Sequence, residues 1–430
     1  MNLINGRMVM SPLERDEALE ALDGLLLGTL EKGALNIEIV LNACDELAMT
    51  IGEEHIPYLM SVGIPHEKAE GYIREAKARL NRGSLSKRLE TELGEKFSFT
   101  GKQAIVRDNG LVVKEKIMPL GVLLHIAAGN QYGLAFYSVI EGLLTGNINL
   151  VKLPAGDDGL SAFILTELFR VEPRLMEYVY LFDYASEEGW AIQKLMDAAD
   201  AVVVWGGDPA IQAVRAMAKP NTGIIEWGHK LSFAYITHAG LRTRALKGLA
   251  GHIIKTNQLL CSSCQGIYLD TDSMYDIFGF CKQFSALLEE SRIEYGEEMP
   301  REVQAQTGLL VYTESLKSQD RPCTVFRGGQ TALLAYEDDS LEPSIPYGHC
   351  WVKRLPRERM LGVLRPHKRH LQTAGLLCTD HERPELTNIL WDAGVVRVTN
   401  GGNMSEGYNL EAHDGEYTLR RYTRIVSEFE

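Results

Sequence analysis

The chain has 430 residues, 45% of them hydrophobic and 24% charged, which is typical of a globular protein with two or three domains. Its formal net charge of −14 argues against a general nucleic-acid binder and against adhesion to anionic membranes. No apolar run approaches the roughly 20 residues of a membrane-spanning helix, and seven scattered cysteines favour a reduced protein over a disulfide framework. We therefore expect a cytoplasmic protein with no membrane span and no nucleic-acid partner.

The N-terminal part, residues 1–100, is predicted to be largely helical. Ser11 and Pro12 offer an N-cap followed by a first-turn proline, and apolar residues then recur at helical spacing. Further helices are predicted over residues 37–51 and 65–80. This part shows no obvious chemistry, and we expect it to pack on the domain that follows.

From residue 101 the pattern changes to short apolar runs. Two of them, at 104–106 and 111–116, predict a hairpin with its turn at 108–110. Strands and helices then alternate, which predicts βαβ units and a parallel sheet in a domain over 101–230. The alternating runs are strand 119–126, helix 134–144, strand 148–153, helix 161–169, strand 178–182, helix 189–199 and strand 201–205.

Three places near predicted strand ends carry groups that suit a bound nucleotide. Lys152 lies on one strand, and Gly206-Gly207 stands between another strand and a helix, as in many pyrophosphate sites. Taken alone, this glycine pair is not GxGxxG and is explained more often by a tight turn. Glu226 also stands near a strand end, where a glutamate by itself is more often a surface salt-bridge partner than a base.

A second α/β domain is predicted over residues 231–390, and it contains the stretch on which we place the chemistry. Cys261 follows a helix-like run and precedes a strand-like one, where a thiol can reach substrate while backbone amides surround it. Cys261-x-x-Cys264 also admits a thioredoxin-type redox pair or half of a zinc site. The zinc interpretation lacks a second ligand pair, because the other cysteines stand alone, and no metal is predicted.

The final segment, residues 391–430, is predicted to form strands and loops that return to the first domain or make an oligomer interface. A basic cluster precedes it. The cluster either attracts the phosphates of a ligand or is a solvated face, and it consists of Arg365, His367, Lys368, Arg369 and His370.

Several motifs keep the order and approximate spacing of known families. Those that resemble the aldehyde dehydrogenase superfamily are Pro119-x-Gly121-Val122, Gly146-Asn147, Lys152-x-Pro154 and Glu226-Trp227-Gly228-His229-Lys230, with Cys261 at a distance of 35 residues from Glu226. Narrower motifs resemble the long-chain acyl-CoA reductases, the reductase component of the bioluminescence-type fatty acid reductase complex. These are His125-Ile126-x-Ala128-Gly129-Asn130, Val204-Trp205-Gly206-Gly207-Asp208, Cys261-Ser262-Ser263-x-Gln265 and His413-Asp414-Gly415.

The resemblance implies an aldehyde-dehydrogenase-like α/β fold, with a Rossmann-type cofactor domain, a second α/β catalytic domain and a helical N-terminal part. It implies Cys261 as nucleophile, Asn130 as oxyanion donor, and Glu226 as either a catalytic residue or one that orients the cofactor. An acidic residue does not directly follow Pro154, which favours NADPH at least as much as NADH. The residues implied to bind this cofactor are Lys152, Gly206, Gly207 and Ala128.

The implied activity is the NADPH-dependent reduction of a fatty acyl thioester to the aldehyde through an acyl-cysteine. The acyl group would come from acyl-CoA or from an acyl-protein synthetase partner, and the enzyme would be a homo-oligomer. The sequence leaves other classes open: a short-chain CoA-acylating or oxidative aldehyde dehydrogenase, a non-redox cysteine acyltransferase, or a scaffold for acylated partners.

Overall fold

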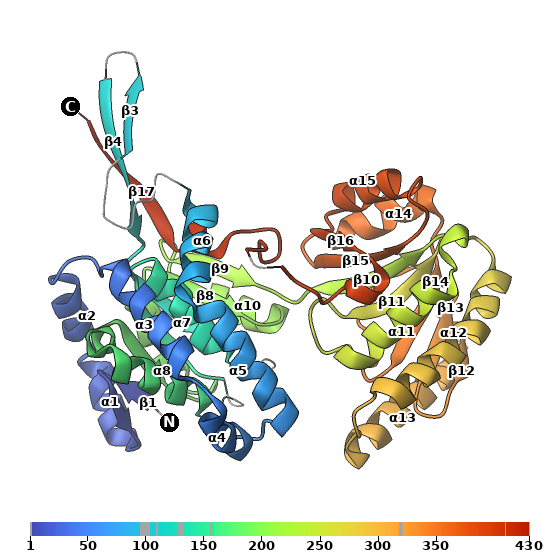
Figure 1. Cartoon of the computed structure of the whole chain (residues 1–430), viewed down its shortest axis with the longest axis horizontal. Coiled ribbons are helices and arrows are strands. Elements are labelled where there is room, and N and C mark those ends of the chain that lie inside the picture. The colour runs from blue at the N-terminus through green and yellow to red at the C-terminus, as the bar shows by residue number, and fades with distance from the viewer. Residues whose placement is uncertain are drawn as a thin grey trace. The chain divides into compact units, whose positions relative to one another are not determined.

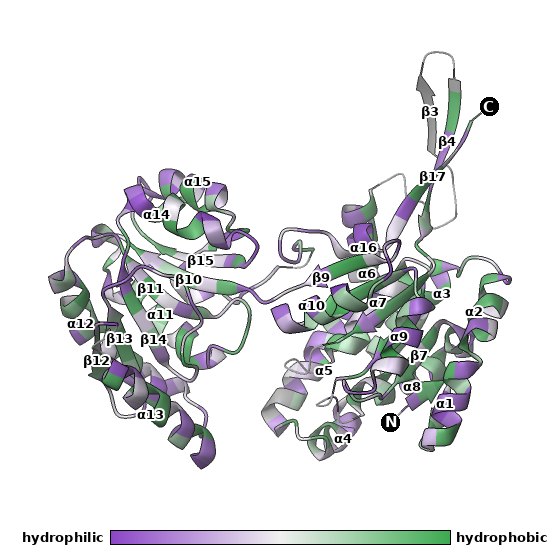
Figure 2. Cartoon of the chain, turned by 180° about the vertical axis from the view of Figure 1, so that it is seen from behind, coloured by the Kyte–Doolittle hydropathy of each residue, from purple (hydrophilic) through white to green (hydrophobic). Residues whose placement is uncertain are grey.

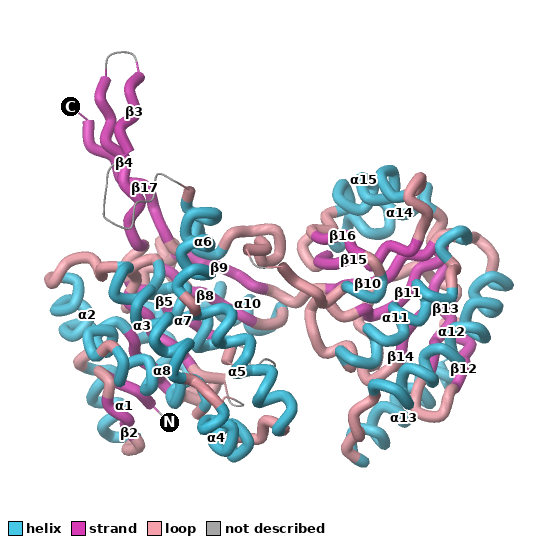
Figure 3. Tube along the Cα trace, in the orientation of Figure 1, coloured by secondary structure: helices cyan, strands magenta, loops and turns pink. Residues whose placement is uncertain are grey.

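The computed structural model describes residues 2–94, 104–108, 111–127, 133–154, 157, 159–317, 321–408 and 410–429. The chain forms two compact units (Figure 1): the first is Met1–Gly228 with Asn409–Glu430, and the second is His229–Tyr408. Each unit contains a seven-stranded sheet with helices packed against it (Figure 3). The predicted α/β fold class is confirmed.

The sheet of the first unit has the order β2-β1-β7-β6-β5-β8-β9. After β5 the chain adds β6 and β7 on one side and then β8 and β9 on the other, so the strand order reverses at β5. In open parallel sheets, ligands bind at the carboxyl ends of the strands beside such a reversal. The strands are β1 (Asn2–Ile4), β2 (Arg7–Val9), β5 (Val122–Ile126), β6 (Ile148–Lys152), β7 (Val179–Phe182), β8 (Ala201–Trp205) and β9 (Gly223–Trp227).

The helices of this unit are α1 (Pro12–Glu20), α2 (Leu22–Leu30), α3 (Ile37–Thr50), α4 (Ile56–Ser61), α5 (His66–Leu80), α6 (Arg82–Leu93), α7 (Leu134–Leu144), α8 (Leu160–Val171), α9 (Gly189–Asp197) and α10 (Asp208–Met217). Alternate side chains of the strands enter two cores. Val151 and Leu181 pack with α3, α7 and α8, whereas Leu150 and Tyr180 pack with α1, α2, α9 and α10. Helices cover both faces, which explains why the central strands are mostly apolar (Figure 2).

The helical N-terminal part belongs to the first unit. Its helix α1 starts as predicted, with Pro12 in the first turn and the Ser11 hydroxyl accepting the Glu14 N–H at 3.4 Å. Helices α3, α5 and α6 share one hydrophobic core with α7 and α8. This part therefore completes the core on one face of the parallel sheet.

A three-stranded antiparallel sheet extends from the first unit (Figure 1). It has the order β17-β4-β3, with β3 (Ala104–Asp108), β4 (Leu111–Pro119) and β17 (Thr423–Phe429). The two strands of the predicted hairpin are present, and residues 109–110 of its predicted turn lie outside the described residues. The short helix α16 (Thr418–Arg421) precedes β17 and packs on α6 and α7.

The sheet of the second unit has the order β12-β13-β14-β11-β10-β15-β16, parallel except for β12. One face packs on α11 and α12, and the other on α14 and α15. The strands are β10 (Leu231–Ile236), β11 (Cys264–Leu269), β12 (Cys323–Arg327), β13 (Ala332–Tyr336), β14 (His349–Arg354), β15 (Leu371–Leu377) and β16 (Arg397–Thr399). The helices are α11 (Thr243–Thr256), α12 (Met274–Tyr295), α13 (Arg301–Leu316), α14 (Arg357–Leu364) and α15 (Arg383–Ala393).

The chain returns to the first unit at residue 409, later than the predicted boundary at 391. The reason is that β16 pairs in parallel with β15 and so keeps residues 397–399 in the second sheet. In the part of the chain that the structure describes, none of the helices has the length and apolar character needed to cross a membrane.

Candidate functional site

The carboxyl ends of the central strands in the first unit bring several predicted groups to one edge. Lys152 is the last residue of β6, Gly206-Gly207 follows β8, and Glu226 is the penultimate residue of β9. The strands β6, β5, β8 and β9 are parallel neighbours, so these ends lie on the same edge. Ala128 and Asn130, which follow β5 in sequence, lie outside the described residues.

Lys152 is a buried cation, with 9% of its surface exposed. Within the described ranges the structure records no hydrogen bond or ion pair for its ammonium group. Burial lowers the pKa of Lys152, and the charges of Asp183 and Glu187 oppose this effect. A buried ammonium group of this kind suits a ligand that brings hydroxyl or phosphate oxygens.

The Gly206-Gly207 turn leads directly into α10. The Gly206 N–H donates to the Trp227 carbonyl oxygen at 3.1 Å, which ties the turn to β9. A Cβ on Gly206 would lie 3.1 Å from that of Ala210, so the turn is tight. Gly207 is the N-cap, and no side chain caps the helix there. First-turn N–H groups and the helix dipole together suit a phosphate.

Glu226 is held in a bidentate ion pair. Arg215 of α10 donates from Nε to Oε1 at 2.5 Å and from Nη2 to Oε2 at 2.8 Å. Arg421 also donates to the backbone carbonyl of Glu226, at 3.4 Å. Both carboxylate oxygens of Glu226 are therefore engaged in a partly exposed ion pair, with side chains 55% (Arg215) and 27% (Glu226) exposed.

Trp205 is a side chain at this edge that the sequence analysis missed. Its Nε1 donates to Ser138 Oγ at 3.2 Å, and Ser138 Oγ lies 2.6 Å from Nδ1 of His125. The other ring nitrogen of His125 lies 3.0 Å from Oδ1 of Asn149. An amide oxygen only accepts, so His125 carries its proton on Nε2 and accepts from Ser138. Burial lowers the pKa of His125 to about 4, so this series of hydrogen-bonded side chains carries no charge at neutral pH.

The indole of Trp205 forms part of an aromatic cluster. It stacks on Trp227 with ring centroids 5.3 Å apart, and the His413 ring lies 5.3 Å from Trp205 and 4.9 Å from Trp227. The cluster stands beside the Gly206-Gly207 turn, and Trp227 at its centre is only 4% exposed. Trp205 and His413 occur in the Val204–Asp208 and His413–Gly415 motifs, but the sequence analysis used these motifs only as evidence for the family and did not predict that the two rings meet.

In the second unit, Cys261 lies exposed on the loop between α11 and β11. The loop begins with Asn257 (φ 48°) and Gln258 (φ 61°), both in the left-handed region. Such conformations cost of order 1–3 kcal/mol each and cluster at functional sites. Ser232 donates its hydroxyl to the Cys261 carbonyl oxygen at 2.7 Å. The Cys261 thiol therefore lies on a strained loop, and the hydrogen bond from Ser232 attaches this loop to β10.

Gln258 holds this loop in place, and its side chain is buried. Its amide nitrogen donates to the Cys264 carbonyl at 3.2 Å and to Ser344 Oγ at 2.7 Å. Its amide oxygen accepts the N–H groups of Gly348 at 2.9 Å and His349 at 3.2 Å. These partners lie up to 91 residues away in sequence, so no local pattern pointed to Gln258.

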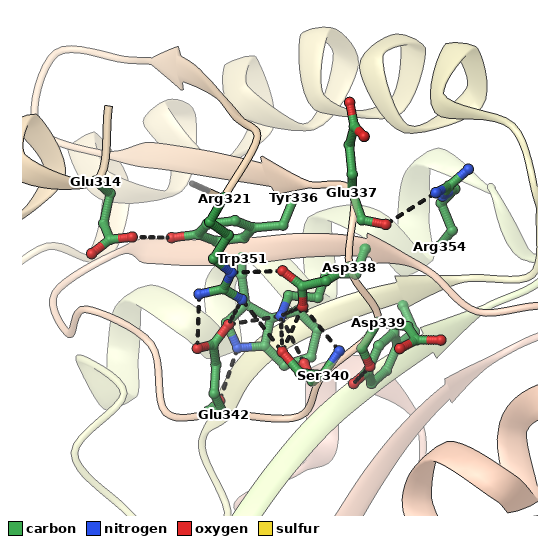
Figure 4. A network of polar contacts seen from close by, with 12 residues as sticks. Glu314, Arg321, Tyr336, Glu337, Asp338, Asp339, Ser340, Glu342, Trp351 and Arg354 are labelled. Carbon is green, nitrogen blue, oxygen red and sulfur yellow. Dashed lines mark hydrogen bonds and ion pairs between the residues drawn. The ribbon is translucent and has the colours of Figure 1, made fainter. Parts of the chain in front are cut away.

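A charged network fixes the segment that Gln258 contacts (Figure 4). Lys353 on β14 is fully buried, and its ammonium group lies 2.7 Å from Asp338 Oδ1 and 2.7 Å from Glu342 Oε1. It also donates to the Ser340 carbonyl at 2.7 Å. Arg321 pairs with the same two carboxylates. The connection between β13 and β14 is therefore fixed at two places. The charged network holds residues 338–342, and Gln258 holds the part that follows, from Ser344 onward.

Cys264 is a core residue and differs in every respect from the exposed Cys261. It is fully buried, its thiol donates to the Gly266 carbonyl at 3.2 Å, and burial raises its pKa to about 12. Its N–H donates to Nε2 of His252 at 3.2 Å, and burial lowers the pKa of His252 to about 4. A buried thiol with a raised pKa is a poor partner in a redox pair. Across the described ranges, no group of three or more His, Cys, Asp or Glu residues is placed to hold a metal ion.

The chain is similar in sequence to bacterial thioester reductases. The long-chain acyl-protein thioester reductase of Vibrio harveyi is 24% identical over 329 residues, which cover 73% of this chain and 65% of that protein. The long-chain acyl-protein thioester reductase of Photobacterium phosphoreum is 31% identical over 192 residues, covering 43% of this chain and 37% of that protein. The chain thus spans less than two thirds of the length of these relatives.

Solved structures with the same fold include several dehydrogenases. Betaine aldehyde dehydrogenase from Staphylococcus aureus, in complex with NAD+, matches with a TM-score of 0.75 and 14% identity, over 100% of this chain and 96% of that one. Glyceraldehyde-3-phosphate dehydrogenase GapN from Methanocaldococcus jannaschii, complexed with NADP, matches with a TM-score of 0.73 and 12% identity, over 99% and 95%. The expected aldehyde-dehydrogenase-like fold is confirmed.

The family model described as acyl-CoA reductase (LuxC) matches residues 34–425. That range includes the strand ends of the first unit and the Cys261 loop of the second. The resemblance expected from the motifs is confirmed, and the chain belongs to the acyl-CoA reductase (LuxC) family.

Proposed function

We propose that this protein is an oxidoreductase that reduces a fatty acyl thioester to the aldehyde, with NADPH as reductant and Cys261 as the acyl carrier. The observation behind the proposal is the exposed Cys261 thiol on a loop fixed by Gln258 and Ser232, in a chain of this family. Relatives from Vibrio harveyi and Photobacterium phosphoreum are named as thioester reductases, in keeping with an acyl thioester as substrate.

The first half of the reaction uses the thiolate of Cys261. Its sulfur attacks the thioester carbonyl carbon, the bond from that carbon to the donor sulfur breaks, and the donor leaves as a thiol after taking up a proton. For stabilising the oxyanion, the family resemblance implies the backbone N–H of Cys261 and the side-chain amide of Asn130. One such donor typically contributes about 2.7–4 kcal/mol to lowering the barrier. The fixed loop holds the sulfur in the geometry that this attack requires.

The second half uses the edge formed by the strand ends of the first unit. Lys152 and the Gly206-Gly207 turn bind the ribose and phosphates of the cofactor, and the family resemblance implies Ala128 as a further cofactor-binding residue. NADPH, when bound, supplies the hydride that converts the acyl group to the aldehyde. Glu226, held by Arg215, orients the cofactor, and release of the aldehyde regenerates the Cys261 thiolate.

We propose that NADPH is used at least as well as NADH, and the contacts of Asp157 support this proposal. Asp157 is the first acidic residue after Pro154, and an acidic residue there would bind the 2′-hydroxyl of the adenosine ribose, which carries a phosphate in NADPH. Its carboxylate instead accepts from Ser161, from the hydroxyl at 2.5 Å and from the N–H at 3.2 Å. Asp157 therefore stabilises the start of α8.

The acyl donor is proposed to be acyl-CoA or an acyl-protein synthetase partner. The second source is in keeping with the name acyl-protein thioester reductase carried by the relatives. We also propose a homo-oligomer in the cytoplasm, as expected from the sequence.

Acylation of a single residue tests the proposal. Dodecanoyl-CoA labelled in its acyl group should leave one hydroxylamine-labile label on Cys261, and NADPH should then discharge it as aldehyde. Cys261→Ser should lower turnover by roughly 10³-fold or more, because a hydroxyl is a much weaker nucleophile. Cys264→Ser is the matched control and should keep most activity, because Cys264 lies in the core. A label on Cys264, or normal turnover in Cys261→Ser, would overturn the proposal.

A further inference from the structure

We infer that a basic surface on the second unit binds the phosphate groups of a coenzyme A thioester, so that the acyl end of the same molecule reaches Cys261. The inference rests on the proposed function and adds to it the residues that recognise the donor. The basic surface consists of Arg365, His367, Lys368, Arg369 and His370.

Strand register places the basic surface at the same edge of the sheet as Cys261. The surface runs directly into β15, whose first residue, Leu371, pairs with Leu231 at the start of β10. The Cys261 loop runs directly into β11, whose first residue pairs with Ser232, also at the start of β10. All three strands are parallel, so both segments lie at their amino-terminal edge. Two strand spacings, about 10 Å, separate β15 from β11.

The three cations Arg365, Lys368 and Arg369 of the basic surface are exposed, and Arg365 also donates one N–H to the Asp392 carbonyl oxygen. Among the described residues, none of Arg365, Lys368 and Arg369 forms an ion pair with a carboxylate. Arginines of the neighbouring helix behave differently, since Arg357 pairs with Asp270 and Arg359 with Asp339. The local excess of positive charge is notable in a chain whose net charge is −14, because such a patch concentrates an anionic ligand at one place.

The backbone of the basic surface is fixed before any ligand binds. Two hydrogen bonds close its turn, from the Lys368 N–H to the Arg365 carbonyl at 3.2 Å and from the His370 N–H to the His367 carbonyl at 2.7 Å. Lys230 reaches across from a distant segment and donates to the Arg369 carbonyl at 3.0 Å. A fixed backbone reduces the conformational entropy that the cationic side chains lose on binding.

Coenzyme A matches this arrangement. Its three phosphate groups lie on the nucleotide end, and a flexible pantetheine arm separates them from the thioester. Arginine binds phosphate through two parallel N–H donors, and lysine does so as a point charge. An acyl-CoA molecule could therefore place its phosphates on the basic surface and its thioester at the Cys261 loop, which lie at the same edge of the sheet.

The test compares two donors that share the thioester and differ in the nucleotide phosphates: dodecanoyl-CoA and dodecanoyl-pantetheine. In the triple variant Arg365→Gln, Lys368→Gln, Arg369→Gln, KM for dodecanoyl-CoA should rise roughly tenfold or more, with kcat nearly unchanged. KM for dodecanoyl-pantetheine should stay the same. The triple variant Arg244→Gln, Lys282→Gln, Arg301→Gln removes the same charge from other exposed sites of this unit and should match the native chain.

Binding of 3′,5′-ADP, measured by calorimetry, tests the same surface without any turnover. It should bind the native chain and the control variant, bind the basic-surface variant at least about tenfold more weakly, and weaken with salt. Equal binding to all three chains, or no binding to any, would overturn the inference. So would a loss of NADPH affinity in the basic-surface variant without a change in 3′,5′-ADP binding. If Cys261 accepts no acyl group from either donor while 3′,5′-ADP binds as expected, the proposed function fails and the phosphate site stands.

Discussion

The two units place their candidate functional groups at opposite ends of similar parallel sheets. In the first unit Lys152 and Gly206-Gly207 stand at the carboxyl ends of strands, where the backbone ladder itself positions them. In the second unit Cys261 precedes its strand, on a loop that a side chain, Gln258, must hold. The comparison shows that a strand end positions a group at little additional cost, whereas a strained loop requires partners from distant parts of the chain.

The largest expected effect is on the free energy of unfolding, and it should differ between the buried charge clusters of the two units. In the first, Arg88 pairs with Glu92 and Glu141, whose side chains are only 3% and 14% exposed. In the second, the cation Lys353 is buried, and its carboxylate partners are about one-third exposed and also bind Arg321. Removing Arg88 therefore leaves buried carboxylates unpaired, whereas removing Lys353 does not.

We predict that Arg88→Met lowers the free energy of unfolding by about 3–5 kcal/mol. Lys353→Met, the matched change in the second unit, should cost clearly less because Arg321 still neutralises the carboxylates. Hydrogen exchange measured by mass spectrometry would assign each loss to its own unit. Equal losses, or a larger loss in Lys353→Met, would contradict the argument from carboxylate burial.

The next effect concerns the loop itself. Gln258→Met keeps the side-chain length but leaves the N–H groups of Gly348 and His349 and the Cys264 carbonyl without their partner. A displaced nucleophile can cost roughly 10²-fold in rate, so single-turnover acylation of Cys261 should slow by about that factor, with NADPH binding unchanged.

Two variants sharpen this prediction about Gln258. Gln258→Glu keeps an acceptor oxygen for the N–H groups of Gly348 and His349 but loses the donor to the Cys264 carbonyl and Ser344 Oγ, so it should give an intermediate rate. Gln306→Met makes the same change on the exposed face of α13 and should acylate normally. If Gln258→Met acylates at the native rate while folded, as judged by circular dichroism, Gln258 has only a structural role.

A smaller effect is expected at the strand ends of the first unit. Lys152→Met removes the buried ammonium group proposed to bind the cofactor. Hydrogen bonds to charged groups contribute about 1.5–3 kcal/mol, so Kd for NADPH should rise roughly tenfold to a hundredfold. Fluorescence titration measures this directly, with Lys87→Met on the exposed face of α6 as control. Acylation of Cys261 without NADPH should not change; a parallel loss there would show that the two sites are not separable.

The same contrast explains what could be predicted from the sequence. The alternation of apolar strands with helices is local, so the strands that end at Lys152 and Trp205 were predicted close to their observed positions. The contacts of Gln258 with Ser344 and His349, and the pairing of Glu226 with Arg215, depend on which segments meet in the fold. The spacing of residues along the chain contains no such information. The late return at residue 409 was missed for the same reason, since β16 is short and gains its place only by pairing with β15.

The smallest expected effect decides the role of Glu226. If it were a general base, Glu226→Gln should slow the reaction by about 10²–10⁴-fold. The bidentate pair with Arg215 predicts a different result, because glutamine keeps one acceptor for the guanidinium and the same shape. We therefore expect the hydride step, followed by stopped-flow loss of NADPH absorbance, to change by less than roughly threefold. Arg215→Met should act similarly, and the double variant should be no slower than either single one, because both changes remove the same contact. A hundredfold loss in Glu226→Gln with normal activity in Arg215→Met would instead assign the proton transfer to Glu226 and place it among the catalytic residues.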